Sequence, residues 1–377
     1  MGVAMCTPTT NFHPPYCPHD KCLNFKQYSG KFYALKGTLQ RKDGSPNKRY
    51  LCKSCKKTFS ESTFKINYRY RKRGHYNFRI FFGLVHNRSN RSIARELKIS
   101  ESTVRGRLIR LSRFALLRHY DFLSKIDISE PVAYDGLEAF ARSQYEPCNI
   151  NQAVGSESLF CYLFNYAPMN RKGRMSKRQK IFLHNLEQEE GRFNPKAIRI
   201  TTKLLFKELV ARKSSKIEQL TIKTDEHFQY QRALNRDLTK SEHKRIHHIS
   251  VSSKKCRNYK NVLFPVNHLD LLIRRKVAAY SRETICFSKT AARMVHKYIL
   301  YICYKNYMKP RFVKKHKTDT LAHVQTPAMK LGLCTKQLKF AEFFIQKPIN
   351  KSELPLDWSH IMQDKTPFER SKRFLKN

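Results

Sequence analysis

Acidic side chains are scarce in this chain. Of its 377 residues, 29 are Asp or Glu and 75 are Lys or Arg, which gives a formal net charge of +46 at pH 7. So large an excess of one sign repels itself, and it is typical of proteins that work against a polyanion. Nucleic acid is the commonest polyanion in cells, so the charge indicates a nucleic-acid partner.

Long apolar runs are missing as well. The longest, at residues 159–166 and 298–304, are far shorter than the ~20 residues that span a bilayer. Residues 1–11 show no basic segment followed by an apolar block, so we expect neither a membrane protein nor a secreted one. Aromatic residues make up 12% of the chain, which excludes a wholly disordered basic protein.

Cysteine does not form the even set that a disulfide framework needs. There are 11 cysteines; five lie within the first 55 residues and the other six are scattered. In a long chain without an export signal, this distribution favours a reducing compartment with one metal site and ordinary buried thiols.

The clustered cysteines predict a structural zinc site in a zinc ribbon over residues 1–70. A tetrahedral Zn²⁺ takes four thiolates at ~2.3 Å, and each pair must lie in a tight turn. Strand-like stretches at 31–39, 49–51 and 58–60 fit this fold. The first pair has four intervening residues rather than two, so His19 or Cys6 could replace one ligand. Unrelated free thiols are the alternative. The predicted ligands are Cys17, Cys22, Cys52 and Cys55.

Residues 71–125 predict a helix-turn-helix domain. Within the segment SIARELKISESTVRGRLIRL at 92–111, apolar residues recur at helical spacing, and Ser100 is suited to cap a second helix. A further helix at about 76–85 would complete the bundle. The second helix carries Arg105, Arg107 and Arg110, which suit phosphates and guanine edges in the major groove. A helical hairpin with a solvated basic face is the alternative.

Residues 128–310 mix strands and helices, and two strands end in aspartate. Asp135 ends a strand from 132, Asp225 ends a strand from 219, and further strands are expected at 159–166 and 247–252. A helix is expected at 200–213 and another at 267–280. This order predicts an RNase H-like α/β domain, so the chain as a whole is expected to be multi-domain α+β with a basic tail at 311–377.

Carboxylates at adjacent strand ends and on a flanking helix can hold two Mg²⁺ ions ~3.5–4 Å apart. Hard divalent ions take oxygen ligands, so Asp and Glu fit and Cys does not. Each carboxylate also has a plain alternative, as a turn residue, a helix cap or an ion-pair partner.

The motifs together resemble the DDE transposases of bacterial insertion sequences. These combine a zinc ribbon, a helix-turn-helix and an RNase H-like domain. The resemblance covers about 15–305 through the four cysteines and the segments SIARELKISESTVRGRL, AYDGLEAF, TIKTDEHFQY, NHLDLLIRR and RETICFSKT.

By this resemblance, Asp135 and Asp225 are the first two catalytic carboxylates and ligands of Mg²⁺ or Mn²⁺. The third carboxylate follows the last core strand, often as Asn-x-x-Glu. The sequence Asn267-x-x-Asp270 fits with Asp in place of Glu, and we favour Asp270 as the third metal ligand over its rival Glu283.

The implied function is a DNA transposase that binds the terminal repeats of its element, hydrolyses a phosphodiester and joins the 3′ end to target DNA. We expect it to act as a homo-oligomer on double-stranded DNA, in the bacterial cytoplasm at the nucleoid. A basic run supplies further backbone contacts: Arg171, Lys172, Lys177 and Arg178. A regulator without catalysis and a structure-selective nuclease are the competing hypotheses.

Overall fold

The structure is a computed structural model. It describes residues 12–19, 21–25, 30–40, 44, 46–64, 75–252, 254–281, 286–314, 319–344, 354–355 and 357–375. The chain divides into two compact units, which are described separately. The N-terminal unit comprises residues 1–74 with 344–350, and the large unit comprises 75–343 with 351–377.

The N-terminal unit is built on a small antiparallel sheet. Its strands are β1 (Tyr33–Gln40), β2 (Pro46–Cys52) and β3 (Thr58–Ser60), in that order. This confirms the three strands predicted from the sequence. Short 3₁₀ turns lie before and after them, η1 (Leu23–Phe25) and η2 (Glu61–Phe64). The cysteines share the core with packed aromatic side chains: Tyr16, Phe32, Tyr33, Tyr50, Phe59 and Phe64.

The large unit opens with three helices, α1 (Tyr76–Leu84), α2 (Asn90–Leu97) and α3 (Glu101–Leu123). As predicted, Ser100 caps the last of them, since its hydroxyl accepts a hydrogen bond from the Thr103 N–H at 3.2 Å. The buried residues Ile93, Ala94 and Leu97 of α2 face this bundle. The second half of α3 packs along α9 (Ala291–Cys303), so these helices and the sheet that follows belong to one compact unit.

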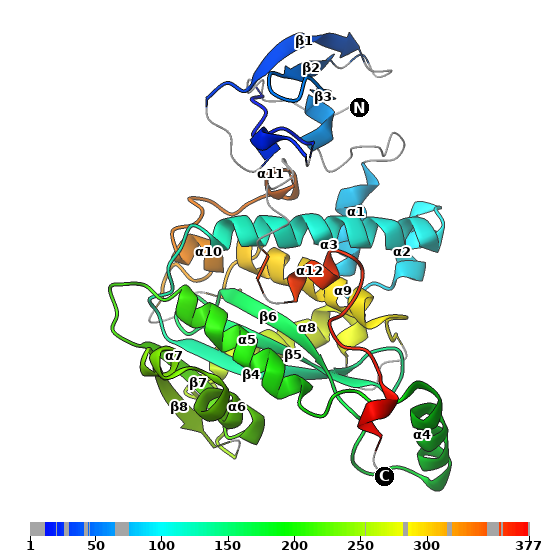
Figure 1. Cartoon of the computed structure of the whole chain (residues 1–377), viewed down its shortest axis with the longest axis vertical. Coiled ribbons are helices and arrows are strands. Elements are labelled where there is room, and N and C mark those ends of the chain that lie inside the picture. Colours follow the sequence, from blue (N-terminus) through cyan, green and yellow to red (C-terminus); the bar gives the residue numbers. More distant parts are fainter. Residues whose placement is uncertain are drawn as a thin grey trace. The chain divides into compact units, whose positions relative to one another are not determined.

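A five-stranded mixed sheet forms the centre of the large unit (Figure 1). Its spatial order is β6 (Cys161–Pro168), β5 (Pro147–Gly155), β4 (Val132–Phe140), β7 (Leu220–Asp225) and β8 (Ile246–Val251). Strands β4, β5 and β6 are antiparallel neighbours, whereas β7 runs parallel to both β4 and β8.

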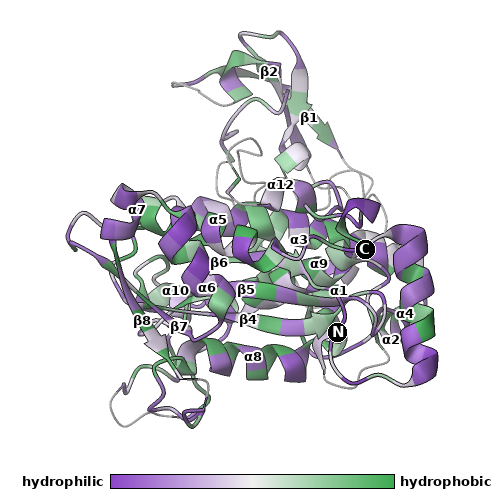
Figure 2. Ribbon diagram, turned by 60° about the horizontal axis from the view of Figure 1, so that its bottom comes forward, coloured by the Kyte–Doolittle hydropathy of each residue, from purple (hydrophilic) through white to green (hydrophobic). Residues whose placement is uncertain are grey.

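Helices cover both faces of this sheet, and the apolar strands lie between them (Figure 2). On one face, α5 (Ala197–Ala211) receives Tyr134, whose hydroxyl is 2.7 Å from Thr202 Oγ1. On the other face lie α8 (Phe264–Lys276) and α9, and the Tyr298 hydroxyl of α9 donates to Gln152 Oε1 at 2.8 Å. The sheet therefore has two differently occupied sides.

No helix in the described part of the chain is both long and apolar enough to cross a membrane.

The remaining helical segments are shorter or peripheral. These segments are α4 (Lys177–Glu190), α6 (Phe228–Arg232), η3 (Ala233–Asp237), α7 (Lys240–Lys244), η4 (Ala278–Tyr280), η5 (Tyr304–Met308), α10 (Pro327–Lys330), α11 (Phe340–Phe343), α12 (Trp358–Ile361) and η6 (Lys372–Phe374).

Two strands differ from the expectation. The sequence prediction missed β5 altogether, although β5 pairs with β4 along the whole length of both strands. The prediction also ended β4 at Asp135, whereas the strand continues to Phe140. The dipeptide Asp135-Gly136 is common in turns, but here Gly136 pairs with Asn151 inside the sheet.

Candidate metal sites and nucleic-acid-binding surfaces

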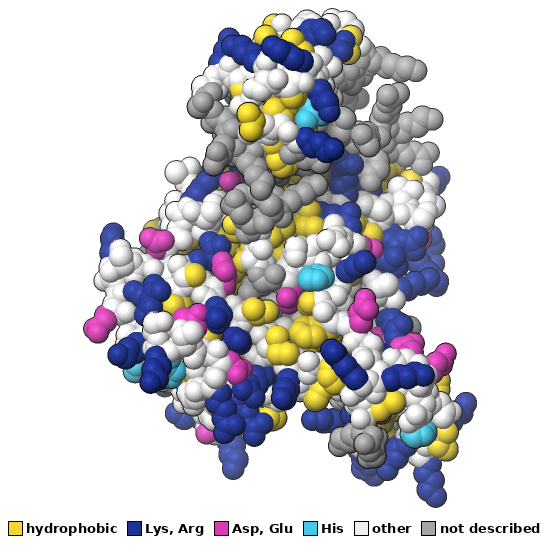
Figure 3. Space-filling model, in the orientation of Figure 1, with side chains coloured by type: hydrophobic (Ala, Val, Ile, Leu, Met, Phe, Trp, Pro, Cys, Tyr) yellow, Lys and Arg dark blue, Asp and Glu magenta, His cyan; other side chains and the backbone are white. Residues whose placement is uncertain are grey.

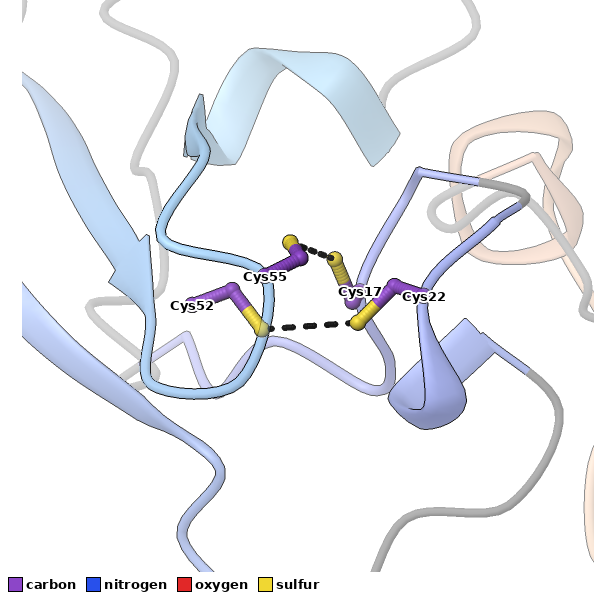
Figure 4. Close-up of side chains that lie close together, drawn as sticks. All are labelled: Cys17, Cys22, Cys52 and Cys55. Atoms are coloured by element: carbon purple, nitrogen blue, oxygen red, sulfur yellow. Dashed lines mark hydrogen bonds between the residues drawn. The ribbon is translucent and has the colours of Figure 1, made fainter.

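Four cysteines converge in the N-terminal unit (Figure 4). The Sγ atoms of Cys17 and Cys55 are 3.7 Å apart, as are those of Cys22 and Cys52. All four sulfur atoms lie within 4.8 Å of one another. Sulfurs at ~2.3 Å from a tetrahedral Zn²⁺ would be about 3.8 Å apart, so the spacing fits this ion.

Two backbone turns bring the cysteine pairs together. In the first, the Cys22 N–H donates to the His19 carbonyl at 3.0 Å, and the longer spacing closes as a compact knuckle. In the second, Lys56 takes the left-handed conformation (φ 56°) and its N–H donates to the Cys52 carbonyl at 3.0 Å. His19 does not belong to the cysteine group, and Cys6 lies outside the described residues.

The thiols have unequal acidities. Burial raises the pKa of Cys17, and a hydrogen bond with the His19 backbone acts in the opposite direction. Burial opposes ionisation of Cys52 too, but the backbone N–H groups of Cys55 and Ser54 hydrogen-bond to its sulfur and lower its pKa to about 7. A zinc ion would bind such a set as thiolates and release the remaining protons. The buried group could therefore bind a structural zinc.

The candidate acidic site begins at the junction of β4 and β7. These strands are parallel, with Val132 opposite Ile222 and Ala133 opposite Lys223. Continued by two residues, the same register sets Asp135 beside Asp225. Parallel strands in register direct matching side chains to the same face, so both carboxylates belong to one side of the sheet. The His227 N–H donates to Asp225 Oδ1 at 3.0 Å and fixes this carboxylate where β7 ends.

Helix α8 brings the third carboxylate to the same side. Gln152 on β5 lies opposite Asp135, and its Nε2 donates to Asp270 Oδ1. The buried Gln152 side chain thus connects the site of Asp135 to helix α8. Its amide oxygen accepts the hydrogen bond from the Tyr298 hydroxyl. Gln152 therefore lies next to Asp135 and Asp270, and Asp225 flanks Asp135 on the other side, on β7.

A charged Asp135 is repelled by the other two carboxylates. Burial, followed by the charges of Asp225 and Asp270, raises the pKa of Asp135 to about 7. Burial also raises the pKa of Asp270 to about 6, although the Gln152 hydrogen bond and the nearby Arg274 and Arg257 act in the opposite direction. Like charges held this close favour either a shared proton or a bound cation.

The acidic group is wider than the cysteine group. Over the described residues, the cysteines are the one set of three or more His, Cys, Asp or Glu side chains whose ligand atoms all lie within 4.8 Å. The three aspartates therefore do not form a tight cage around one ion. Two ions ~3.5–4 Å apart require no such cage, since each carboxylate can bind one ion or bridge both. The rival Glu283 lies outside the described residues.

The three arginines of the predicted recognition helix differ in their exposure to solvent. Arg105 is half-buried and has an ion pair with Glu101 at 3.5 Å. Arg110 is also half-buried, whereas Arg107 is 5% exposed and faces the protein interior. Ser102, Thr103 and Gly106 complete the exposed side of the first turns of α3. Arg107 is therefore poorly placed to contact a base.

The predicted basic run lies on the surface of the large unit. Lys172, Lys177 and Arg178 are exposed, and Arg171 lies over the Phe140 ring at 5.2 Å from its centroid. Helix α4 begins at this run and is capped by Ser176. Lys and Arg side chains predominate over Asp and Glu on the face shown in Figure 3.

Sequence reasoning missed several residues around the acidic site. Gln152 was missed because its strand was missed, and Arg257 lies in a polar segment without a recognisable pattern. Gly136 gives room for Asn149, because a Cβ at this glycine would lie 2.1 Å from the Asn149 amide.

Comparisons with known proteins do not add an identity to this geometry. No family model matches the sequence, and no curated protein matches it.

Proposed function

We propose that the protein is a DNA transposase of the DDE class, with an RNase H-like domain in its large unit. One observation carries the proposal: Asp135, Asp225 and Asp270 converge from two adjacent parallel strands and a covering helix on one face of a mixed sheet. The repulsion of Asp135 by Asp225 and Asp270 supports cation binding at this place, because a divalent cation would relieve it.

The residues present fit a pair of divalent ions. The donor set is all oxygen, which suits Mg²⁺ or Mn²⁺. When bound, such ions supply an activated water or 3′-hydroxyl and stabilise the leaving oxygen of a phosphodiester. The chain's own part is to hold three carboxylates in place: β4 and β7 fix Asp135 and Asp225, and Gln152 fixes the Asp270 carboxylate.

Basic surfaces would bind the DNA. Arg105 and Arg110 border the exposed start of α3, and Lys172, Lys177 and Arg178 stand free on the surface at α4. Contacts of this kind neutralise phosphates and release counterions, so they give affinity that falls with salt. The cysteine-bearing unit would add a zinc ribbon for recognition of the element ends, and cutting two ends together would require at least a dimer.

The test is cleavage and joining of labelled DNA that carries the ends flanking this gene. We expect Mg²⁺- or Mn²⁺-dependent cleavage and joining by the wild type, and a loss of at least 1,000-fold in Asp225→Asn, since a metal ligand is removed while shape is kept. Asp237→Asn is the matched control, because this aspartate pairs with Arg199 away from the site.

Three results would contradict the proposal. Product formed equally by wild type and Asp225→Asn would remove the aspartates from catalysis. Cleavage of branched DNA without any joined product would favour a structure-selective nuclease. Tight, salt-sensitive binding without product from either protein would favour a regulator.

A further inference from the structure

A pocket of about 360 Å³ lies in the large unit, away from the three aspartates. Its wall comes from the starts of α2 and α3, from residues 286–289 and from α9. Its lining is strongly cationic. Five cations face one carboxylate, Glu101; the cations are Arg91, Arg105, Lys289, Arg293 and Lys297.

The single carboxylate is already engaged. Glu101 has an ion pair with Arg105 at 3.5 Å and accepts a hydrogen bond from Asn90 Nδ2 at 3.1 Å. It therefore neutralises at most one of the five cations and positions Arg105 at the wall. No carboxylate other than Glu101 is among the residues that line the pocket, and the charge of Asp364 acts on Arg293 from outside that lining.

Two buried polar atoms at the pocket have no hydrogen-bond partner among the residues that the structure describes. Ser288 is 4% exposed, and its hydroxyl makes no hydrogen bond within the described part of the chain. The Arg293 Nε atom is buried and unpaired as well. Buried polar groups in proteins are usually hydrogen-bonded, so these two atoms suit a ligand or water that completes them.

Helix termini add to the positive potential. Ser89 and Asn90, at the start of α2, belong to the lining, and α9 starts between the lining residues Lys289 and Arg293. Helix N-termini carry partial positive charge and present N–H groups to anions. Burial lowers the pKa of Lys297, whereas the charges of Cys286 and Glu101 act in the opposite direction.

We propose that this pocket binds a phosphate group. The ligand must be anionic, must accept several hydrogen bonds and must have room for an attached sugar, because the pocket is larger than a phosphate alone. A phosphate of the DNA backbone and a free phosphate share this chemistry. The inference does not rest on the catalytic proposal, because binding there requires neither the aspartates nor a divalent ion.

The experiment uses the full chain without added divalent metal. Inorganic phosphate is titrated by calorimetry, and a duplex of arbitrary sequence is titrated by fluorescence anisotropy at several salt concentrations. Lys297→Met removes the charge of a half-buried lysine, and Ser288→Ala removes only the unpaired hydroxyl. Lys216→Met, at an exposed lysine between α5 and β7, is the matched control.

We expect Lys297→Met to weaken phosphate binding at least tenfold and Ser288→Ala about threefold, with less than a twofold change in the control. If the ligand is a backbone phosphate, Lys297→Met also lowers the slope of log K against log salt by about 1. If only phosphate binding weakens and DNA binding does not, the ligand is a free phosphate-bearing molecule.

The proposal is overturned if wild type does not bind phosphate saturably, or if both variants bind it as the control does. Thermal unfolding of each variant separates lost binding from lost folding. If Lys297→Met does not fold, two milder variants replace it: Lys297→Arg keeps the charge and Ser288→Ala keeps the packing. Phosphate binding kept in Lys297→Arg and weakened about threefold in Ser288→Ala supports the proposal. Phosphate binding in Ser288→Ala that equals the control overturns it.

Discussion

The cysteine site and the aspartate site differ in how the chain assembles them. The cysteines come from two short turns within 39 residues of sequence, and their sulfur atoms meet closely in a small aromatic core. The aspartates come from 136 residues of sequence, from two strands and a helix, and they are held near one another against their repulsion. The cysteine group is a local arrangement that could bind a structural zinc, whereas the aspartates are brought together by the tertiary fold of the large unit.

The largest expected effect breaks the first arrangement. We expect Cys52→Ser to unfold the N-terminal unit and leave the large unit folded, because structural zinc contributes about 10 kcal/mol or more to small domains. Limited proteolysis with circular dichroism measures this. Cys256→Ser, at an exposed free thiol, is the control. A protease-resistant N-terminal unit in Cys52→Ser would show that the fold does not depend on the metal.

The second prediction tests the room around the aspartates. Gly136→Ala places a Cβ 2.1 Å from the Asn149 amide, so we expect a loss of about 1–3 kcal/mol in the free energy of unfolding of the large unit. Denaturant titration measures it. In contrast, Gly106→Ala in α3 meets nothing within 4 Å, and we expect a gain of up to about 1 kcal/mol from helix propensity. Equal effects of the two substitutions would contradict the close packing at Gly136.

The third prediction uses the raised pKa of Asp135, which burial and the charges of Asp225 and Asp270 cause. The pKa of Asp135 is about 7 in the fold against an ordinary value of 3.8, so the folded state keeps a proton that the unfolded chain releases between these values. The stability of the metal-free protein therefore falls as pH rises from about 4 to about 7, and then levels off.

Asp135→Asn removes the ionisable carboxyl group and with it this loss of stability at high pH. We expect the variant to be more stable than the wild type at pH 8 by about 1–3 kcal/mol, with the difference closing towards pH 4. Thermal or denaturant unfolding across this range measures it. Asp121→Asn, which loses only ion pairs with Arg118 and Lys125 at the surface, should show no such gain. A stability difference between Asp135→Asn and the wild type that grows as pH falls would contradict the raised pKa of Asp135.

The two sites also differ in how far the sequence predicted them. Cysteine spacing fixes a local site, and the predicted ligands did converge. Strand β5 escaped prediction because its buried residues Asn149, Asn151 and Gln152 are polar. Asn149 donates to Asn151 and Asn151 donates to Thr201 of α5, whereas Gln152 is paired with Asp270 and Tyr298. That pattern is typical of a loop until the neighbouring elements are known, so the glutamine that holds Asp270 could not be identified.

The basic residues show the same limit. Charge along the sequence marked Arg105, Arg107 and Arg110 alike, yet only packing against the rest of the large unit reveals that Arg107 faces inward. The phosphate pocket joins positions 91 and 105 to positions 289–297. No local pattern relates these stretches, since their approach depends on the packing of α3 along α9.

Counting bound Mn²⁺ by electron paramagnetic resonance at pH 8 tests the central claim most directly. The three aspartates are predicted to bind two ions in the wild type, to lose both in a protein carrying Asp135→Asn and Asp225→Asn, and to keep them in Asp121→Asn. A wild type that binds no Mn²⁺, or a double variant that binds as many ions as the wild type, would contradict it.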